Sequence, residues 1–147
     1  MMSATILPLF DKSLQTTAIW LEEIQSDIGP DRAFAWRVLS VVLQQLRDHL
    51  PLELSAHFGA QLPLIVRGTF YDRFDPTGLP RPTHGGDEFL QAVADGLRDS
   101  RGVDPRDAVQ SVFGVLDRHL SRGQIEKVAR SLPRGIRAMW PDSEVVE

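Results

Sequence analysis

The chain has 147 residues, 42% of them apolar and 7% aromatic, which is enough for a globular core in one domain or two small ones. Its 16 basic and 20 acidic side chains leave a net charge of −4, which argues against general binding to polyanions, and the lack of cysteine excludes disulfides and thiolate sites. No apolar run approaches the roughly 18 residues of a membrane span, and the first residues lack the regions of a signal peptide. We therefore expect a cytoplasmic protein that makes no membrane contact.

The first half of the chain has the apolar periodicity of four helices. Residues 1–10 show no such pattern and are predicted to form a flexible arm. Apolar residues then recur at steps of three and four from Leu14 to Ile28, which predicts a helix with these residues on its buried face, ended by Gly29-Pro30. The further helices of this half are predicted over about 31–49, after Pro51 and from Pro63, where Val66 and Phe70 face inward.

Residues 73–86 break every periodicity and are rich in glycine and proline, so they are predicted to form a linker loop. The helical pattern then resumes and continues almost to the end of the chain. The helix starts of this half are predicted at Asp87, at the cap Asp104 with Pro105 behind it, at the capping box Ser121-x-x-Gln124, and at Pro133. Residues 143–147 are predicted to form an acidic tail.

A repeat relates the two halves. Residues 38–72 align with 108–142 without gaps, and the first copy is identical to the second at positions 42, 46, 49, 50, 62, 63, 67 and 72. Amphipathic helices share leucine spacing for packing reasons alone, but the common His-Leu and Leu-Pro-x-x-x-Arg elements argue for duplication. We therefore predict an all-α fold of two tandem four-helix units, 11–72 and 87–142, packed with pseudo-twofold symmetry.

The stretch from Gln61 to Pro76 carries a family resemblance. Its sequence, QLPLIVRGTFYDRFDP, resembles a bacterial family catalogued as domain of unknown function 2267 (DUF2267). Supporting stretches lie at 17–21, 46–50 and 88–90, and the resemblance covers about residues 14–142. It implies a soluble helical bacterial protein without an assigned activity, and it carries over no catalytic residue.

Arg67 and Arg137 occupy equivalent positions of the repeat, each one residue after an apolar residue expected to face the core. Two such guanidinium groups could clamp an anionic ligand. They could instead bind a carboxylate or the carbonyl end of a neighbouring helix. Their presence in both copies favours this structural interpretation, because duplicated scaffolds retain packing residues.

The histidines offer few metal or acid–base candidates. His49 and His119 fall in the last turns of their predicted helices, where a histidine stabilises the helix dipole and the free carbonyls. No His-x-x-x-His or Glu-x-x-His pair occurs in the sequence. His84, in the glycine-rich loop, is the one freely placed candidate for a metal ligand or general base, and we expect no metal and no cofactor.

Tyr71, Phe74 and Asp75 add aromatic and charged side chains where the first unit ends, and the second unit has no equivalent run. An addition to one copy of a duplicated scaffold is a place where function can arise, so these residues form our candidate partner surface. The alternative is that Tyr71 and Phe74 fasten the linker to the helices.

Three functions remain open, and the first is favoured. It is a non-catalytic protein-interaction module that binds another protein or itself. The second is a small-molecule or anion-binding protein, or an enzyme, with a pocket between the two units, although no phosphate loop or nucleophile elbow supports an activity. The third is nucleic-acid binding through the basic second unit, which we do not expect because no aromatic residues interleave with its basic ones. These basic residues are Arg118, Arg122, Lys127, Arg130, Arg134 and Arg137.

Overall fold

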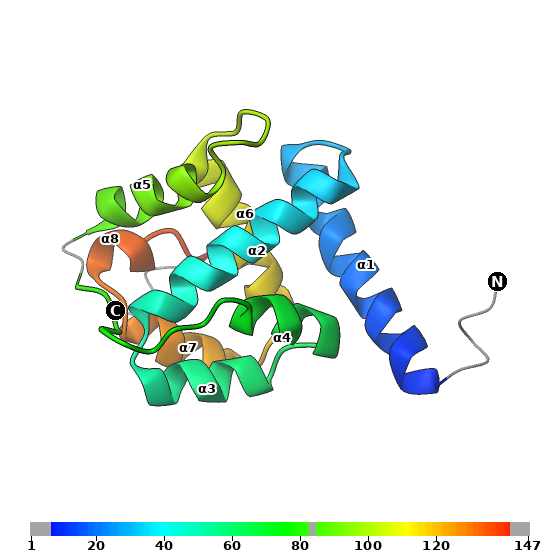
Figure 1. Cartoon of the computed structure of the whole chain (residues 1–147), viewed down its shortest axis with the longest axis horizontal. Coiled ribbons are helices and arrows are strands. Elements are labelled where there is room, and N and C mark those ends of the chain that lie inside the picture. Colours follow the sequence, from blue (N-terminus) through cyan, green and yellow to red (C-terminus); the bar gives the residue numbers. More distant parts are fainter. Residues whose placement is uncertain (1–6, 83–84, 142–147) are drawn as a thin grey trace.

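The computed structural model describes residues 7–82 and 85–141, and within these ranges all of its regular secondary structure is α-helix (Figure 1). Its helices are α1 (Pro8–Ile28), α2 (Arg32–His49), α3 (Leu52–Ala60), α4 (Leu64–Tyr71), α5 (Gly86–Gly96), α6 (Pro105–His119), α7 (Arg122–Arg130) and α8 (Arg134–Arg137). The expected all-α fold class is confirmed. No helix in the described part of the chain has both the length and the apolar character needed to cross a membrane. Residues 1–6, His84, Asp142 and the tail 143–147 lie outside the described residues.

Side-chain caps set several helix starts. The carboxylate of Asp104 accepts a hydrogen bond from the Arg106 amide at 3.0 Å, and the hydroxyl of Ser121 accepts one from the Gln124 amide at 3.2 Å, as the sequence predicts. Helix α1 differs from expectation because it begins at Pro8 rather than near residue 11. A proline in the first turn loses no helical hydrogen bond, so the helix takes in residues that were expected to belong to the arm.

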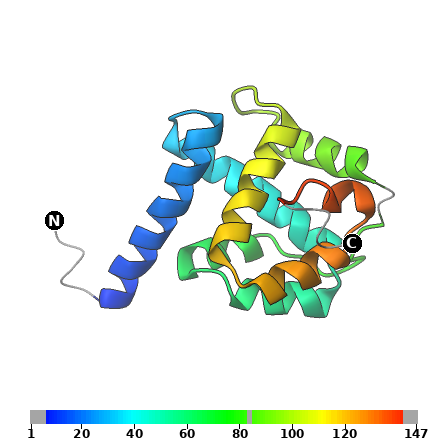
Figure 2. The same cartoon turned by 180° about the vertical axis from the view of Figure 1, so that it is seen from behind.

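The core is one cluster built around the two long helices α2 and α6. Helix α2 contacts α1, α4, α5 and α6, while α6 contacts α1, α2, α5 and α7. Helices α3 and α7 lie side by side beneath them (Figures 1 and 2). The fully buried aromatic side chains of this core include Trp20, Phe58, Phe70, Phe89 and Phe113.

Several features of the first four helices recur in the last four. Helix α7 has the bounds of α3 shifted by 70 residues, and Pro63 and Pro133 precede α4 and α8 with nearly equal dihedral angles (φ −57°, ψ 153° and φ −57°, ψ 155°). Helix α1 packs on α6, and α5 packs on α2. Each of these crossings places a histidine at the end of one helix against an aromatic ring of the other. The ring pairs are His49 with Phe89, 5.2 Å between centroids, and His119 with Trp20, 5.5 Å.

The first part of α1 projects away from the other helices (Figures 1 and 2). Its later part is anchored by buried Trp20, Leu21 and Ile24. Nearer the amino end, the hydroxyl of Ser13 accepts a hydrogen bond from the Ile65 amide at 3.1 Å, which ties α1 to the start of α4. Leu14 was expected on the buried face, but 52% of its surface is exposed because the buried face of α1 begins at Ser13 and Thr17, which leaves Leu14 at its edge.

Candidate functional site

Arg67 lies on α4, and its guanidinium reaches the carbonyl end of α3, which is the kind of contact that the structural interpretation expects. Its Nη2 atom donates to the carbonyl oxygens of Ala60, 3.2 Å away, and Leu62, 2.9 Å away. The Nε atoms of Arg67 and Arg137 are both buried without a hydrogen-bond partner among the described residues. The two arginines differ in that carbonyl contacts within the described residues are seen for the guanidinium of Arg67 alone. The carbonyl contacts of Arg67 close the turn between α3 and α4 and leave less of its guanidinium free for a ligand.

The candidate partner surface of Tyr71, Phe74 and Asp75 is partly engaged within the fold. The Tyr71 ring meets the Phe70 ring edge-on at 5.0 Å and the Phe74 ring at 5.9 Å. Asp75 is exposed, and its carboxylate accepts a hydrogen bond from the Thr77 amide at 3.0 Å, which shapes the following turn. This packing favours the alternative in which the two aromatic rings fasten the linker to the helices.

Arg47 is a buried arginine that sequence reasoning did not single out. Only 4% of it is exposed, and its Nε lies 2.7 Å from the carboxylate of Asp48. Its Nη1 donates to the carbonyl oxygens of Phe70 (2.9 Å) and Asp72 (2.8 Å), and its guanidinium carbon lies 5.3 Å from the centre of the Phe74 ring. One side chain therefore fixes the end of α4 and the start of the linker. The signal available in the sequence was an arginine four residues after Leu43, on the apolar stripe of its helix.

The two repeated histidines differ in their surroundings. His49 is buried against Phe89, and this desolvation lowers its pKa despite the hydrogen bond between its Nδ1 and the Gln45 carbonyl at 2.7 Å. Nε2 of His119 lies instead 2.8 Å from the carboxylate of Glu23. Burial alone would raise the pKa of Glu23, but hydrogen bonds from His119 and Arg118 outweigh it and the pKa is lowered. Among residues 7–82 and 85–141, no three histidine, aspartate or glutamate side chains are grouped so that they could hold a metal ion.

Ion pairs neutralise part of the basic second half. The guanidinium of Arg118 lies 2.8 Å from the carboxylate of Glu23, and that of Arg122 lies 3.6 Å from the carboxylate of Asp117. These pairings reduce the positive field that a nucleic-acid surface needs.

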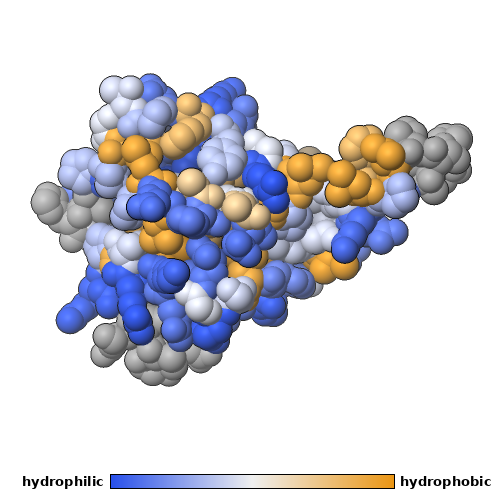
Figure 3. All heavy atoms as spheres, turned by 90° about the horizontal axis from the view of Figure 1, so that it is seen from below, coloured by the Kyte–Doolittle hydropathy of each residue, from blue (hydrophilic) through white to orange (hydrophobic). Residues whose placement is uncertain are grey.

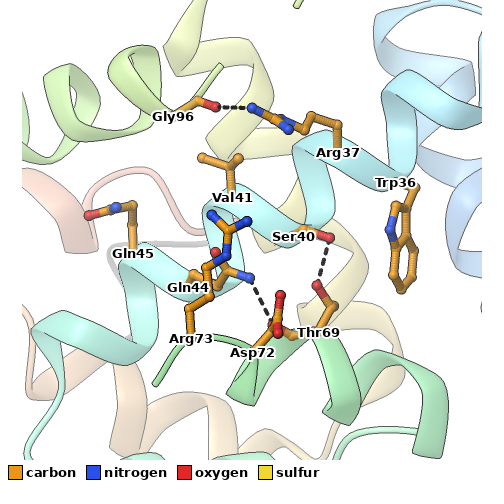
Figure 4. A pocket seen from close by; sticks show the side chains of 10 residues that line it. All are labelled: Trp36, Arg37, Ser40, Val41, Gln44, Gln45, Thr69, Asp72, Arg73 and Gly96. Atoms are coloured by element: carbon orange, nitrogen blue, oxygen red, sulfur yellow. Dashed lines mark hydrogen bonds between the residues drawn. The ribbon is translucent and has the colours of Figure 1, made fainter. Parts of the chain in front are cut away.

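A polar groove crosses α2 on the side that faces α4 and α5 (Figure 4). It encloses about 340 Å³. Its floor is ordered by hydrogen bonds from the Thr69 hydroxyl to the Ser40 hydroxyl (2.8 Å) and from the Gln44 amide to the Thr69 carbonyl (2.9 Å). The lining residues are Trp36, Arg37, Ser40, Val41, Gln44, Gln45, Thr69, Asp72, Arg73 and Gly96. Sequence reasoning named none of these as site residues, since they come together only through tertiary packing.

An apolar surface lies along the projecting part of α1, and we call it the arm face (Figure 3). Its side chains are 43–56% exposed, and they are Leu7, Leu9, Phe10, Leu14 and Ile19. Beside it is a hollow of about 360 Å³ that is almost entirely apolar, bounded by Leu14 and Leu21 on α1, Trp36 on α2 and Ile65 on α4. Leu7, Phe10 and Leu14 share one side of the segment because they are spaced by three and four residues, whereas Leu9 and Ile19 point to other sides. A row of exposed apolar residues along one side of a helix, unlike residues scattered singly, marks an interaction surface.

Comparison with known proteins places most of the chain in one family. The family model described as "Uncharacterized conserved protein (DUF2267)" matches residues 17–139. Among curated proteins, none matches the chain. The matched range begins after the projecting turns of α1, so most of the arm face precedes it.

Proposed function

The chain belongs to the DUF2267 family, and we propose that this member is a non-catalytic protein-interaction module whose docking surface is the arm face. The observation that carries the proposal is the concentration of exposed apolar side chains on one segment. Of the seven large hydrophobic residues exposed in the described part of the chain, five belong to the arm face. Burying a leucine or phenylalanine side chain fully contributes roughly 1.5–3 kcal/mol, and a partner that covers the half-exposed Leu7, Phe10 and Leu14 gains part of that free energy at each.

The geometry of the arm face suits a helical partner. Leu7, Phe10 and Leu14 follow one another at steps of three and four, the spacing by which an amphipathic helix presents its apolar face to another helix. The adjoining hollow beside Trp36 and Ile65 can accept a side chain from that partner. Such a surface needs shape and apolar area rather than charge.

The occupant we propose is a second copy of this chain. Residues 7–21 carry one acid, Asp11, and one base, Lys12, so this segment has no net charge although the chain carries −4. Two arm faces can therefore meet without the repulsion that the rest of the surface would impose. An isologous pair, in which the same surface is used by both copies, is the commonest arrangement in homo-oligomers.

We infer further that the scaffold arose by duplication and that the arm was added to one copy. The shifted bounds of α3 and α7, the matched prolines and the reciprocal packing of α1 on α6 and α5 on α2 support two four-helix units with pseudo-twofold symmetry. In this arrangement α5 corresponds to the later part of α1, and the projecting turns have no counterpart. Function is often grafted onto a duplicated scaffold by such an addition.

Sedimentation velocity over a range of concentrations tests the proposal. The wild-type chain is expected to dimerise, and the variant Phe10→Ser/Leu14→Ser is expected to dimerise at least a hundredfold more weakly, since each copy loses two apolar contacts. Leu52→Ser is the matched control, because Leu52 is similarly exposed but lies on α3. A wild-type chain that stays monomeric at every concentration, or a double variant that dimerises as the wild type does, would refute the proposal.

A further inference from the structure

We propose that the polar groove across α2 binds a small organic molecule through an oxyanion, a phosphate or carboxylate group, held between Arg37 and Arg73. Both arginines line the groove, and their guanidinium groups approach it from either side of Val41 (Figure 4). A volume of about 340 Å³ is within the range of small-ligand sites. None of the residues that line the groove belongs to the arm face, although Trp36 also borders the hollow beside it.

The two guanidinium groups retain free hydrogen-bond donors. Arg37 donates from Nη2 to the Gly96 carbonyl at 2.9 Å, which leaves its other donors available. Within residues 7–82 and 85–141, neither arginine lies within 4.0 Å of a carboxylate in an ion pair. Asp72 is the single acidic residue of the lining, so two positive charges against one leave the groove net positive on a chain with a net charge of −4.

The floor of the groove supplies a further donor. Ser40 is only 9% exposed, and its oxygen accepts the hydrogen bond from the Thr69 hydroxyl. Its own hydroxyl hydrogen has no acceptor in the described hydrogen bonds and can turn into the groove. A hydroxyl that already accepts a hydrogen bond is a stronger donor, because neighbouring bonds in a chain polarise one another.

Arg73 is held in place by backbone geometry. Its φ of +61° lies in the left-handed region, which is uncommon for a residue other than glycine. The preceding carbonyl, that of Asp72, accepts the 2.8 Å hydrogen bond from buried Arg47. The hydrogen bond from Arg47 therefore fixes the backbone just before this left-handed residue. Residues held in such uncommon backbone conformations are concentrated at ligand sites.

A second groove offers an internal comparison. Under the inferred duplication, a shift of 70 residues carries Arg37 to Asp107 and Ser40 to Gln110. The first helices of the two units correspond at a shift of 69, which pairs Trp20 with Phe89, and this shift pairs Asp27 with Gly96. Asp27, Asp107 and Gln110, with Ser111, line a cavity of about 260 Å³. The scaffold thus forms a groove at both equivalent places, but the first copy places arginine where the second places aspartate. The positive charge is therefore a feature of the groove in the first unit, and the equivalent groove in the second unit lacks it.

The test is a titration of the ¹⁵N-labelled chain with inorganic phosphate, and separately with acetate, followed by amide NMR shifts at ionic strength held constant with chloride. Saturable shifts are expected at Ser40, Gln44 and Gly96. Saturation with phosphate alone would indicate a phosphorylated ligand, and saturation with both a broader oxyanion preference. Arg37→Gln and Arg73→Gln should each weaken the binding about tenfold, the typical effect of losing a charge-assisted hydrogen bond.

Two control variants separate the groove from general charge effects. Arg130→Gln removes an exposed arginine from the end of α7, and Asp107→Asn alters the second groove; both should bind phosphate as the wild type does. Shifts that spread over many arginines and never saturate, or undiminished binding by both Arg37→Gln and Arg73→Gln, would overturn the proposal.

Discussion

Replacing Arg47 by methionine should lower the free energy of unfolding by about 3–5 kcal/mol, the usual effect of breaking a buried ion pair. Methionine preserves much of the volume but donates no hydrogen bond. The carbonyl oxygens of Phe70 and Asp72 and the carboxylate of Asp48 would each lose a donor. An unsatisfied buried polar group costs about 1–3 kcal/mol, so the buried Phe70 carbonyl and Asp48 carboxylate together account for about 2–6 kcal/mol, which includes that range.

Urea unfolding followed by far-ultraviolet circular dichroism measures the change. Arg118→Met is the matched control, since Arg118 also pairs with a carboxylate at 2.8 Å but its side chain is 52% exposed, and its loss should cost at most about 1 kcal/mol. The double variant Arg47→Met/Asp48→Leu should recover part of the stability, because no unpaired charge then remains. If Arg47→Met unfolds within 1 kcal/mol of the wild type, the anchoring role assigned to Arg47 is wrong.

Three further predictions concern the packed histidine and the aromatic rings. The pKa of His49 is lowered in the folded chain, so the unfolded chain binds more protons. The free energy of unfolding should therefore fall as the pH drops below 6.5, the ordinary pKa of a histidine. His49→Leu should remove this part of the pH dependence, measured by urea unfolding between pH 5 and 8. Gly59→Ala places a methyl group 2.5 Å from the Tyr71 hydroxyl and should cost about 1–3 kcal/mol, with Tyr71→Ala in the same chain relieving the clash. Tyr71→Ala/Phe74→Ala should lower the melting temperature markedly and leave dimerisation through the arm face unchanged; loss of dimerisation with normal melting would instead restore Tyr71 and Phe74 as the partner surface.

The sequence predicted where the helices lie far better than it predicted which helices pack against one another. Local signals sufficed for the caps at Asp104 and Ser121, and for the inward faces at Val66 and Phe70, both fully buried. Periodicity identifies which residues share a helix face, but not whether another helix covers that face. Leu14 belongs to the apolar stripe of its helix and is nonetheless exposed, because the buried face at this level passes through the polar residues Ser13 and Thr17.

The residues of the polar groove, and buried Arg47, could not be predicted from the sequence for a related reason. Arg37 and Arg73 are far apart in the sequence, and neither belongs to a motif, so no local pattern joins them. Arg47 appeared as an ordinary charged residue near a helix end, whereas tertiary packing buries it beneath the linker. The repeat drew attention to Arg67 and Arg137, which are equivalent in position, but the polar groove involves residues in which the two copies differ.

The packing of α1 on α6 constrains how the chain can fold during its synthesis. The hydroxyl of Ser111 bonds to the carboxylate of Asp27, and the guanidinium of Arg118 bonds to that of Glu23, across 84 and 95 residues of chain. At a translation rate of about 5–20 residues per second, α1 emerges roughly 4–19 s before the helix that covers Trp20. During that interval α2 and α4 can already pack on α1, but the side of α1 that α6 covers, with Trp20, stays exposed. A nascent chain stalled before residue 105 should therefore be bound by ribosome-associated chaperones, and one extended past α8 should be released.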